Sequence, residues 1–272
     1  MLTRIIVGAI LAVTLITVMF FLPPVCLALV VCLIVTVGSR ELLRAIQVPT
    51  GNGMYILTAV SAGIIPLGYL LGHGMQVTYA AMLLLVAALF FIAIRGYNRD
   101  EPLDFKSLMV CQFGGLVIPV LLSALIQLRC MEHGKYLIFL PVLSAWLTDV
   151  GAYFVGVFFG KHKGITKVSP KKSLEGYIGG IVFGSLVMLV YGLALRQLVG
   201  LNINLAVMAV YGLVGSAMTE LGDLTFSLIK RQHGIKDYGT VFPGHGGMLD
   251  RFDSMIFAAP TMLLLVWLIP AF

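Results

Sequence analysis

The stretch from Thr78 to Ile94 reads TYAAMLLLVAALFFIAI and carries no charged side chain over its 17 positions. A helix needs about 20 predominantly apolar residues to cross a bilayer, so this stretch is typical of a transmembrane helix. The whole chain has the same character, because 60% of its 272 residues are hydrophobic and only 11% are charged. A soluble domain has about 25% charged residues, which its water-facing surface requires. The composition therefore predicts an integral membrane protein and excludes a soluble enzyme, a disordered protein and a secreted disulfide scaffold.

Apolar segments of similar length recur along the chain and predict an all-α, polytopic bundle of about nine transmembrane helices. With nine crossings, 15 of the 18 lysines and arginines fall on the side of the N-terminus. Because basic residues are enriched in cytoplasmic loops, we expect the N-terminus in the cytoplasm and the C-terminus outside. The net charge of +6 follows from this topology, so no nucleic-acid partner is expected. The segments lie near residues 5–22, 24–38, 54–72, 78–94, 107–128, 136–159, 176–195, 203–226 and 252–270.

Polar residues are concentrated in the C-terminal half, where seven of the twelve acidic residues fall within 145–253. We therefore divide the chain into an N-terminal membrane scaffold, residues 1–135, and a C-terminal catalytic region, residues 136–272. The catalytic region has two polar connections, 160–175 and 227–251, which the expected topology places in the cytoplasm.

The segment near 203–226 and the residues after it carry a polar stripe. Its members are spaced 4, 3, 4 and 3 residues apart, so at about 100° per residue they share one face of a helix. A carboxylate inside an apolar segment costs about 3 kcal/mol and is normally paired or bound to a cation. We expect the stripe to face a polar cavity; the alternative is that its acids simply reach water at the cytoplasmic end. The stripe consists of Ser216, Glu220, Asp223, Ser227 and Lys230.

Asp149 is the only acidic residue in the segment 136–159, and it lies among small residues. Ala145, Ala152 and Gly156 share its helical face and would let a ligand or another helix approach closely. Asp149 is therefore a candidate site residue, although the sequence leaves open that it only pairs with a loop lysine.

The connection after this segment is strongly basic. Ser169 and Pro170 predict the start of a helix, because serine is a favoured N-cap and proline a favoured first helical residue. Phosphate binding on that positive first turn would be favourable. The alternative is that the lysines only anchor the loop to anionic lipid headgroups. The lysines are Lys161, Lys163, Lys167, Lys171 and Lys172. The segment that follows has a glycine at every fourth position, which predicts a close helix–helix contact. These glycines are Gly176, Gly180 and Gly184.

The connection 227–251 holds the strongest chemical pattern. Three glycines surround His245 and give a backbone whose amides can bind an anion. Asp250 and Asp253 follow, three residues apart, where the last helix opens. Mg²⁺ binds through one or two carboxylates together with substrate phosphates. This combination predicts metal-assisted phosphoryl or nucleotidyl transfer at the membrane surface.

The stretch from Ser227 to Asp253 resembles the signature of the phosphatidate cytidylyltransferases, S-x-aliphatic-K-R-x4-K-D-x-G-x2-F-P-x-H-G-G-aliphatic-x-D-R-F-D. Residues 148–153 and 169–176 resemble the upstream motifs of that family, with Ser173 where Thr is commoner. The resemblance implies that CTP and phosphatidic acid give CDP-diacylglycerol and pyrophosphate, with Mg²⁺ required. It also implies a homodimer and a second, monovalent cation such as K⁺, with Asp223 and Asp250 at the positions of the metal carboxylates.

The residues and the resemblance together give a hypothesis for a site at the cytoplasmic face of the bacterial inner membrane. A phosphatidate oxygen attacks the α-phosphorus of CTP and pyrophosphate leaves, while Asp223 and Asp250 hold the cation that bridges the phosphates. Further candidate metal ligands are Asp149, Glu220 and Asp253. Lys230, Arg231 and His245 complete the predicted catalytic set, since such chemistry depends on positioning and electrostatics. The predicted substrate-binding residues are Asp149, Lys167, Lys171, Lys172, Ser173, Ser227, Lys236, Asp237, Gly246, Gly247 and Arg251.

Three other functions stay open on the sequence alone. A CTP-dependent lipid-alcohol kinase would share the nucleotide and the membrane but would release CDP rather than pyrophosphate. A cation or proton transporter would also use buried acids but would not need a connection rich in glycine and lysine. A structural membrane scaffold would not need the carboxylate stripe.

Overall fold

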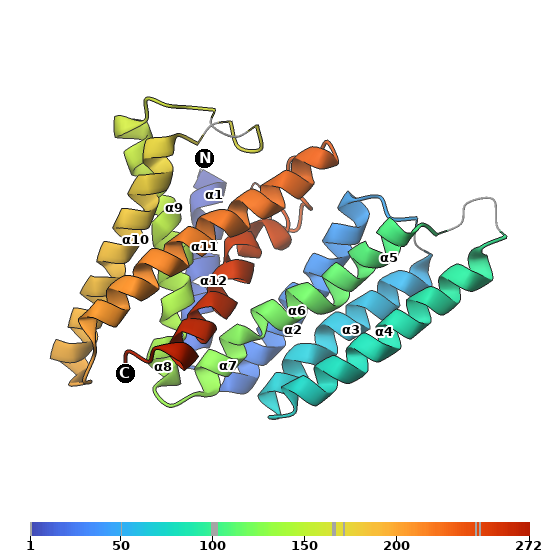
Figure 1. Cartoon of the computed structure of the whole chain (residues 1–272), viewed down its shortest axis with the longest axis horizontal. Coiled ribbons are helices and arrows are strands. Elements are labelled where there is room, and N and C mark those ends of the chain that lie inside the picture. Colours follow the sequence, from blue (N-terminus) through green and yellow to red (C-terminus); the bar gives the residue numbers. More distant parts are fainter. Residues whose placement is uncertain are drawn as a thin grey trace. The chain divides into compact units, whose positions relative to one another are not determined.

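The computed structural model describes residues 2–49, 51–98, 103–164, 167–170, 172–242, 244 and 246–272, with side chains from residue 8 onward except Asn52. Two predicted site residues, Lys171 and His245, lie outside the described residues. The described chain is helical and holds two isolated bridges but no strand, which confirms the all-α prediction (Figure 1). The helices are α1 (Leu2–Phe20), α2 (Pro24–Ala45), α3 (Asn52–Leu70), α4 (Gly74–Gly96), α5 (Phe105–Gln112), α6 (Ile118–Leu122), α7 (Ala124–Cys130), α8 (Gly134–Leu137), α9 (Phe139–Phe159), α10 (Leu174–Ala194), α11 (Leu205–Gln232) and α12 (Leu249–Leu268), with π-helical turns at Phe113–Val117 and Leu195–Val199.

Each of the nine predicted apolar segments coincides with helix over most of its length. Eight helical stretches among the described residues are long and apolar enough to cross a membrane. The ninth, in α1, is counted only from Gly8 to Phe20 and is a shorter apolar helix. A polytopic helical membrane fold is therefore confirmed, while the orientation of the termini stays a prediction.

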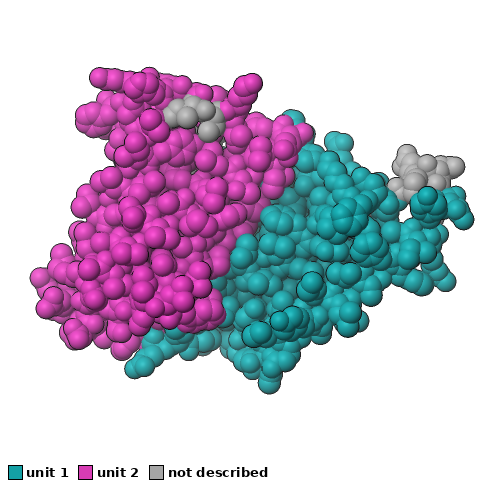
Figure 2. All heavy atoms as spheres, in the orientation of Figure 1, with its two compact units in different colours: residues 1–132, 233–252 teal, residues 133–232, 253–272 magenta. Residues whose placement is uncertain are grey.

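The chain forms two compact units (Figure 2). Unit 1 comprises residues 1–132 and 233–252, so it combines α1 to α7 with most of the last polar connection and the first turn of α12. Its apolar core includes Ile65, Leu85, Leu89 and Cys111, all of which are at most 1% exposed. The predicted division at residue 135 concerns function and stays a prediction.

Arg129 holds the end of α1 and the turn that follows it in place by hydrogen bonds. Its Nε donates to the carbonyl oxygen of Met19 (2.9 Å), and its Nη2 donates to that of Leu22 (3.2 Å). The last carbonyl groups of a helix have no partner within the helix, and a basic side chain can satisfy them. Arg129 therefore stabilises the end of α1 and the turn into α2.

Unit 2 comprises residues 133–232 and 253–272, and so holds α8 to α11 and most of α12. Buried hydroxyl groups join α9 to α11: Thr148 Oγ1 donates to Ser216 Oγ (2.7 Å). One turn away, Ser144 Oγ and Thr219 Oγ1 lie 3.4 Å apart. Hydrogen bonds of this kind hold membrane helices together.

Glycines let α9 and α10 pack closely in unit 2. A Cβ atom added to Gly176 would lie 2.9 Å from the carbonyl oxygen of Ala152, and one added to Gly180 would lie 2.9 Å from that of Thr148. One added to Gly184 would lie 2.7 Å from Thr148 Oγ1. No side chain fits in such a space, so the predicted close helix–helix contact at these glycines is confirmed.

The predicted helix start at Ser169 is wrong. Helix α10 begins at Leu174, and its N-cap is Ser173, whose Oγ accepts a hydrogen bond from Gly176 N (3.2 Å). Ser169 lies in a turn, in which its carbonyl oxygen accepts a hydrogen bond from Lys172 N (3.2 Å). The contact between His162 Nδ1 and Glu175 Oε1 (2.6 Å) fastens the connection to the first turn of α10. Lys172 therefore precedes the helix instead of lying on its first turn.

Candidate functional site

The polar stripe of α11 faces other polar groups inside unit 2. Ser216 is completely buried and bonds to Thr148, and Glu220 is only 4% exposed. The alternative in which the acids simply reach water is therefore wrong for Glu220. Further along the helix, Asp223 and Ser227 are half-buried and Lys230 is buried.

Three carboxylates of unit 2 gather around one ammonium group. Lys172 Nζ lies 2.7 Å from Glu220 Oε2, 2.7 Å from Asp223 Oδ2 and 4.0 Å from Asp149 Oδ1. We call these four residues the Lys172 cluster. Asp149 thus does approach a loop lysine, as the alternative interpretation expected, but it does so together with two further acids. With one positive and three negative groups, the cluster has a formal charge of −2.

Access to solvent increases across the Lys172 cluster. The side chain of Glu220 is 5% exposed, that of Asp223 24% and that of Asp149 49%. Burial alone would lower the pKa of the Lys172 ammonium, but Asp223 and Glu220 outweigh that effect and raise it above its usual value. The ammonium is therefore fixed in its charged form, and the cluster opens on the side of Asp149.

The Lys172 cluster has the donors that Mg²⁺ prefers. Mg²⁺ binds oxygen ligands and takes only one or two carboxylates when phosphates supply the rest. Glu220 Oε1 is buried and has no hydrogen-bond partner within the described part of the chain, so one donor atom is available there. No group of three or more acidic, histidine or cysteine side chains among the described residues is arranged to hold a metal ion by itself. The donors present fit a cation that is bound jointly with phosphates.

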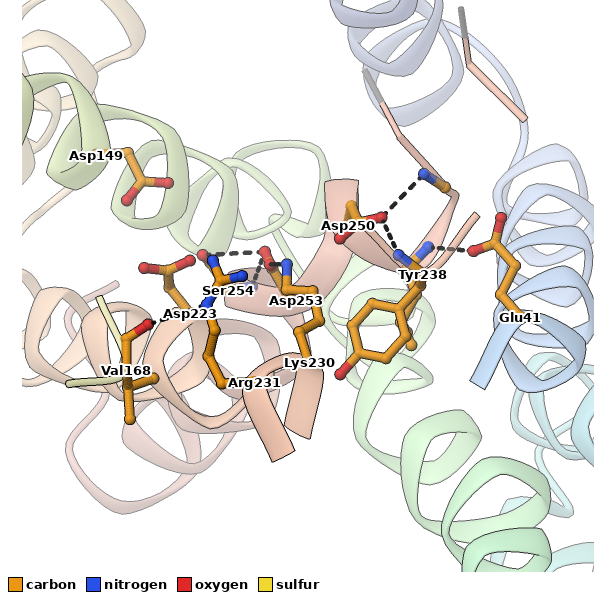
Figure 3. Close-up of polar contacts among 12 residues, drawn as sticks. Glu41, Asp149, Val168, Asp223, Lys230, Arg231, Tyr238, Asp250, Asp253 and Ser254 are labelled. Atoms are coloured by element: carbon orange, nitrogen blue, oxygen red, sulfur yellow. Dashed lines mark hydrogen bonds and ion pairs between the residues drawn. The ribbon is translucent and has the colours of Figure 1, made fainter. Parts of the chain in front are cut away.

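A second ion pair of unit 2 joins the end of α11 to α12. Lys230 Nζ lies 3.9 Å from Asp253 Oδ2, and both side chains are mostly buried (Figure 3). Asp253 Oδ1 also accepts from Ser254 N (2.8 Å). Arg231 reaches the basic connection, where its Nε donates to the carbonyl oxygen of Val168 (3.5 Å). The end of α11 therefore carries two cations, of which Lys230 is paired with α12 and Arg231 is bonded to the basic connection.

In unit 1, Asp250 closes the loop that precedes α12. Its Oδ2 accepts hydrogen bonds from Tyr238 N (2.8 Å) and Gly247 N (2.9 Å) (Figure 3). The loop is closed further by a bond from Phe242 N to the Gly246 carbonyl oxygen (3.0 Å). One amide of the predicted anion-binding turn, that of Gly247, is therefore already bonded to a carboxylate of the protein.

Glu41, a functional candidate that sequence reasoning missed, supports the same loop. This residue of α2 is 7% exposed, and its carboxylate accepts from Met248 N (3.0 Å) and Leu249 N (2.9 Å). The sequence offers one signal for it: Glu41 is an acid in a largely apolar helix, and Leu42 and Leu43 continue the apolar pattern directly after it. The partners of this acid lie 207 and 208 residues further along the chain, and no local pattern identifies them.

The structure distributes the predicted site residues over both units. Asp223 lies in unit 2 and Asp250 in unit 1, so the hypothesis that they share one cation stays a prediction. Ser173 caps α10, while Lys167, Lys236 and Arg251 are exposed. The predicted residues in unit 2 are Asp149, Lys167, Lys172, Ser173, Glu220, Asp223, Ser227, Lys230, Arg231 and Asp253, and those in unit 1 are Lys236, Asp237, Gly246, Gly247, Asp250 and Arg251.

Comparison with known proteins identifies the group to which this chain is related. Residues 2–269 match the sequence profile of the Cytidylyltransferase family. The chain belongs to the cytidylyltransferase family. Proteins named phosphatidate cytidylyltransferase from Staphylococcus epidermidis and Staphylococcus aureus are 43% identical to it over 135 residues. The one from Staphylococcus saprophyticus is 41% identical over 135 residues.

The similarity to these cytidylyltransferases covers only part of each chain. Each match extends over 50% of this chain and 50% of the relative, so the chain spans about half the length of the curated relatives it matches. Membership of the cytidylyltransferase family makes the Lys172 cluster and the loop closed by Asp250 the two places where nucleotide chemistry is to be sought.

Proposed function

We propose that this protein transfers the cytidylyl group of CTP to phosphatidic acid and so makes CDP-diacylglycerol and pyrophosphate for phospholipid synthesis. The observation that carries the proposal is the match of residues 2–269 to the cytidylyltransferase family. The names of the staphylococcal relatives support phosphatidate as the acceptor. Among the described residues, eight apolar helices are long enough to cross a membrane, which supports a lipid substrate.

The reaction is a substitution at phosphorus. An oxygen of the phosphatidate phosphate forms a bond to the α-phosphorus of CTP, and the bond from that phosphorus to the oxygen bridging to the β-phosphate breaks. Pyrophosphate leaves with the electron pair of the broken bond. A phosphate monoester is already largely ionised at neutral pH, so no strong general base is required. The protein's contribution is then positioning and charge, as in other phosphate transfers.

Unit 2 has residues that can position the phosphates and neutralise their charge. Lys172 and Lys230 hold ammonium groups at 26% and 10% side-chain exposure, where partial burial strengthens their attraction for phosphate oxygens. Asp223 and Asp149 line the accessible side of the Lys172 cluster and would hold Mg²⁺, with Glu220 behind them. When bound there, Mg²⁺ supplies neutralisation of the phosphate charges. Lys172 and Lys230 orient the phosphates by their fixed positions.

The proposal extends to the setting of the reaction. It includes an active site at the cytoplasmic face of the bacterial inner membrane, a homodimer, and a second, monovalent cation such as K⁺. The asymmetry of the basic residues supports the cytoplasmic side, because CTP is a cytoplasmic solute and basic loops face that compartment.

Turnover of defined substrates tests the proposal. The full chain, purified in detergent, is given CTP and phosphatidic acid with and without Mg²⁺, and CDP-diacylglycerol and pyrophosphate are measured. We expect both products in equal amounts and only with the metal. Asp223→Asn should abolish the reaction, although the variant is still found in the membrane fraction from which it is extracted. Release of CDP from a lipid alcohol would favour the kinase instead, and ion flux into liposomes without CTP turnover would favour the transporter.

A further inference from the structure

Glu41 ties the N-terminal helices to the loop before α12. Its two carboxylate oxygens accept from different backbone amides, Oε1 from Met248 N (3.0 Å) and Oε2 from Leu249 N (2.9 Å). These amides lie at the N-terminal end of α12, where a helix has unpaired donors and a positive dipole. Figure 3 shows the Glu41 side chain reaching from its helix toward this backbone. The carboxylate therefore does for α12 what an N-cap residue does, but from a distant part of the sequence.

Two glycines of the signature make room for the Glu41 carboxylate. A Cβ atom added to Gly247 would lie 2.6 Å from Oε1 and 2.6 Å from Oε2 of Glu41. The three atoms nearest to a Cβ added to Gly239 also all belong to the Glu41 side chain. Neither glycine has a positive φ, so the backbone conformation alone would accept alanine at both positions. The neighbour that excludes a side chain there is Glu41.

The Glu41 contact extends to Asp250 through the backbone. Gly247 N and Tyr238 N both donate to Asp250 Oδ2, and Asp250 directly follows Leu249, whose amide Glu41 holds. The described residues between Tyr238 and Gly247 and the first turn of α12 are thus joined by hydrogen bonds, and Glu41 links them to α2. A change at Glu41 must therefore displace the loop and Asp250 together.

We propose that Glu41 is a positioning residue of the cytidylyl transfer, because it holds the loop 238–247 and Asp250 in the arrangement that the reaction needs. This role rests on the proposed function. Glu41→Gln is the sharpest perturbation of it: the side chain keeps its size, but one acceptor oxygen becomes an NH₂ donor that faces a backbone N–H. The substitution removes one bond and sets two donors against each other, so the start of α12 must shift.

The test compares Glu41→Gln with Asp104→Ala in the full chain purified in detergent. Asp104 is a matched control, because it is also an acid of unit 1 that caps a helix, and its Oδ1 accepts from Ser107 N (2.9 Å) at the start of α5. Two readouts are taken: kcat and KM for CTP, and the rate at which trypsin cleaves after the exposed Lys236.

For Glu41→Gln we expect kcat to fall about 10- to 100-fold, as for a displacement of roughly 1 Å in an active site. KM for CTP should change by less than about threefold, because Lys172 and Lys230 are untouched. Cleavage after Lys236 should accelerate, since the loop is no longer held. Asp104→Ala should change neither readout. If Glu41→Gln does not accumulate, Glu41→Asp takes its place, since it keeps the charge but is one methylene too short to hold both amides.

A double-mutant cycle tests the contact itself. Gly247→Ala should accelerate cleavage after Lys236 in the parent but add little in Glu41→Ala, where the carboxylate that it would strike is absent. Additive effects would contradict the contact. Unchanged kcat and cleavage in Glu41→Gln, with an active parent, would overturn the positioning role alone. A parent that makes no CDP-diacylglycerol would overturn the proposed function and this role with it.

Discussion

Replacing Lys172 by methionine should destabilise unit 2 strongly. The substitution keeps most of the side-chain volume but removes the ammonium that Glu220 and Asp223 each contact at 2.7 Å. Glu220 is then left as a buried acid whose other oxygen already has no partner within the described chain. A buried charge without a partner is among the costliest defects that a single substitution can introduce.

The size of the effect follows from the geometry. At an effective dielectric constant of about 20, two unit charges 2.7 Å apart attract each other by about 6 kcal/mol. Much of that attraction is offset by the desolvation of both groups, and removal of one partner of a buried pair typically costs about 3–5 kcal/mol. Asp223 is 24% exposed and regains some solvation, so we expect the lower end, about 3 kcal/mol. For a chain of this size, that loss lowers the thermal midpoint by about 10 °C.

The assay is thermal unfolding of the purified chain in detergent, followed by tryptophan fluorescence, because the two tryptophans, Trp146 and Trp267, both lie in unit 2. Lys172→Arg is the matched control, since it keeps the positive charge. The double variant Lys172→Met with Glu220→Gln should recover at least about half of the loss, because no buried charge is then left without a partner. A midpoint for Lys172→Met close to that of the parent, or no recovery in the double variant, would refute the interpretation of the cluster.

Two further predictions concern packing and pH. Gly180→Ala should separate α9 from α10 and lower the free energy of unfolding by about 1–3 kcal/mol, because its Cβ would lie 2.9 Å from the Thr148 carbonyl oxygen. Gly53→Ala is the control: its Cβ would have nothing within 4 Å, so stability should stay the same or rise slightly. Equal thermal midpoints for both variants would contradict the close contact. Because the pKa of the Lys172 ammonium is raised above 10.5, its stabilising contribution is complete below that pH and is lost only as the pH rises past the raised value. The difference in midpoint between the parent and Lys172→Met should therefore be the same at pH 8 as at pH 10, and a difference that shrinks over this range would be inconsistent with the raised pKa.

The helical fold could be predicted because the relevant physics is local. A chain that crosses a bilayer must satisfy its backbone groups within each segment, so an apolar run such as 78–94 indicates a helix without reference to the rest of the molecule. The polar stripe from Ser216 to Lys230 and the glycines from 176 to 184 were predictable for the same reason, since both follow from the helical period.

Features that depend on distant partners could not be predicted. Ser169 and Ser173 are both suitable N-caps by sequence, and the second one caps α10 while Lys172 turns back to Glu220, 48 residues away. The glycines around His245 indicate an anion-binding turn, but the amides of Gly247 and Met248 bond to Asp250 and Glu41. Glu41 itself lies in a region that composition assigned to a scaffold, and its role depends on partners more than 200 residues away.

The long separation between Glu41 and its partners has a consequence for how the protein is made. Translation proceeds at about 5–20 residues per second, so Met248 is added about 10–40 s after Glu41, which precedes it by 207 positions. During that interval α2 already carries an acid that has yet to meet the amides that will hold it. The N-terminal helices can be inserted in order, but unit 1 is complete only after residues 233–252 have been added. We therefore expect a nascent chain truncated before Met248 to leave Glu41 without its two amide partners, even if its first seven helices have formed.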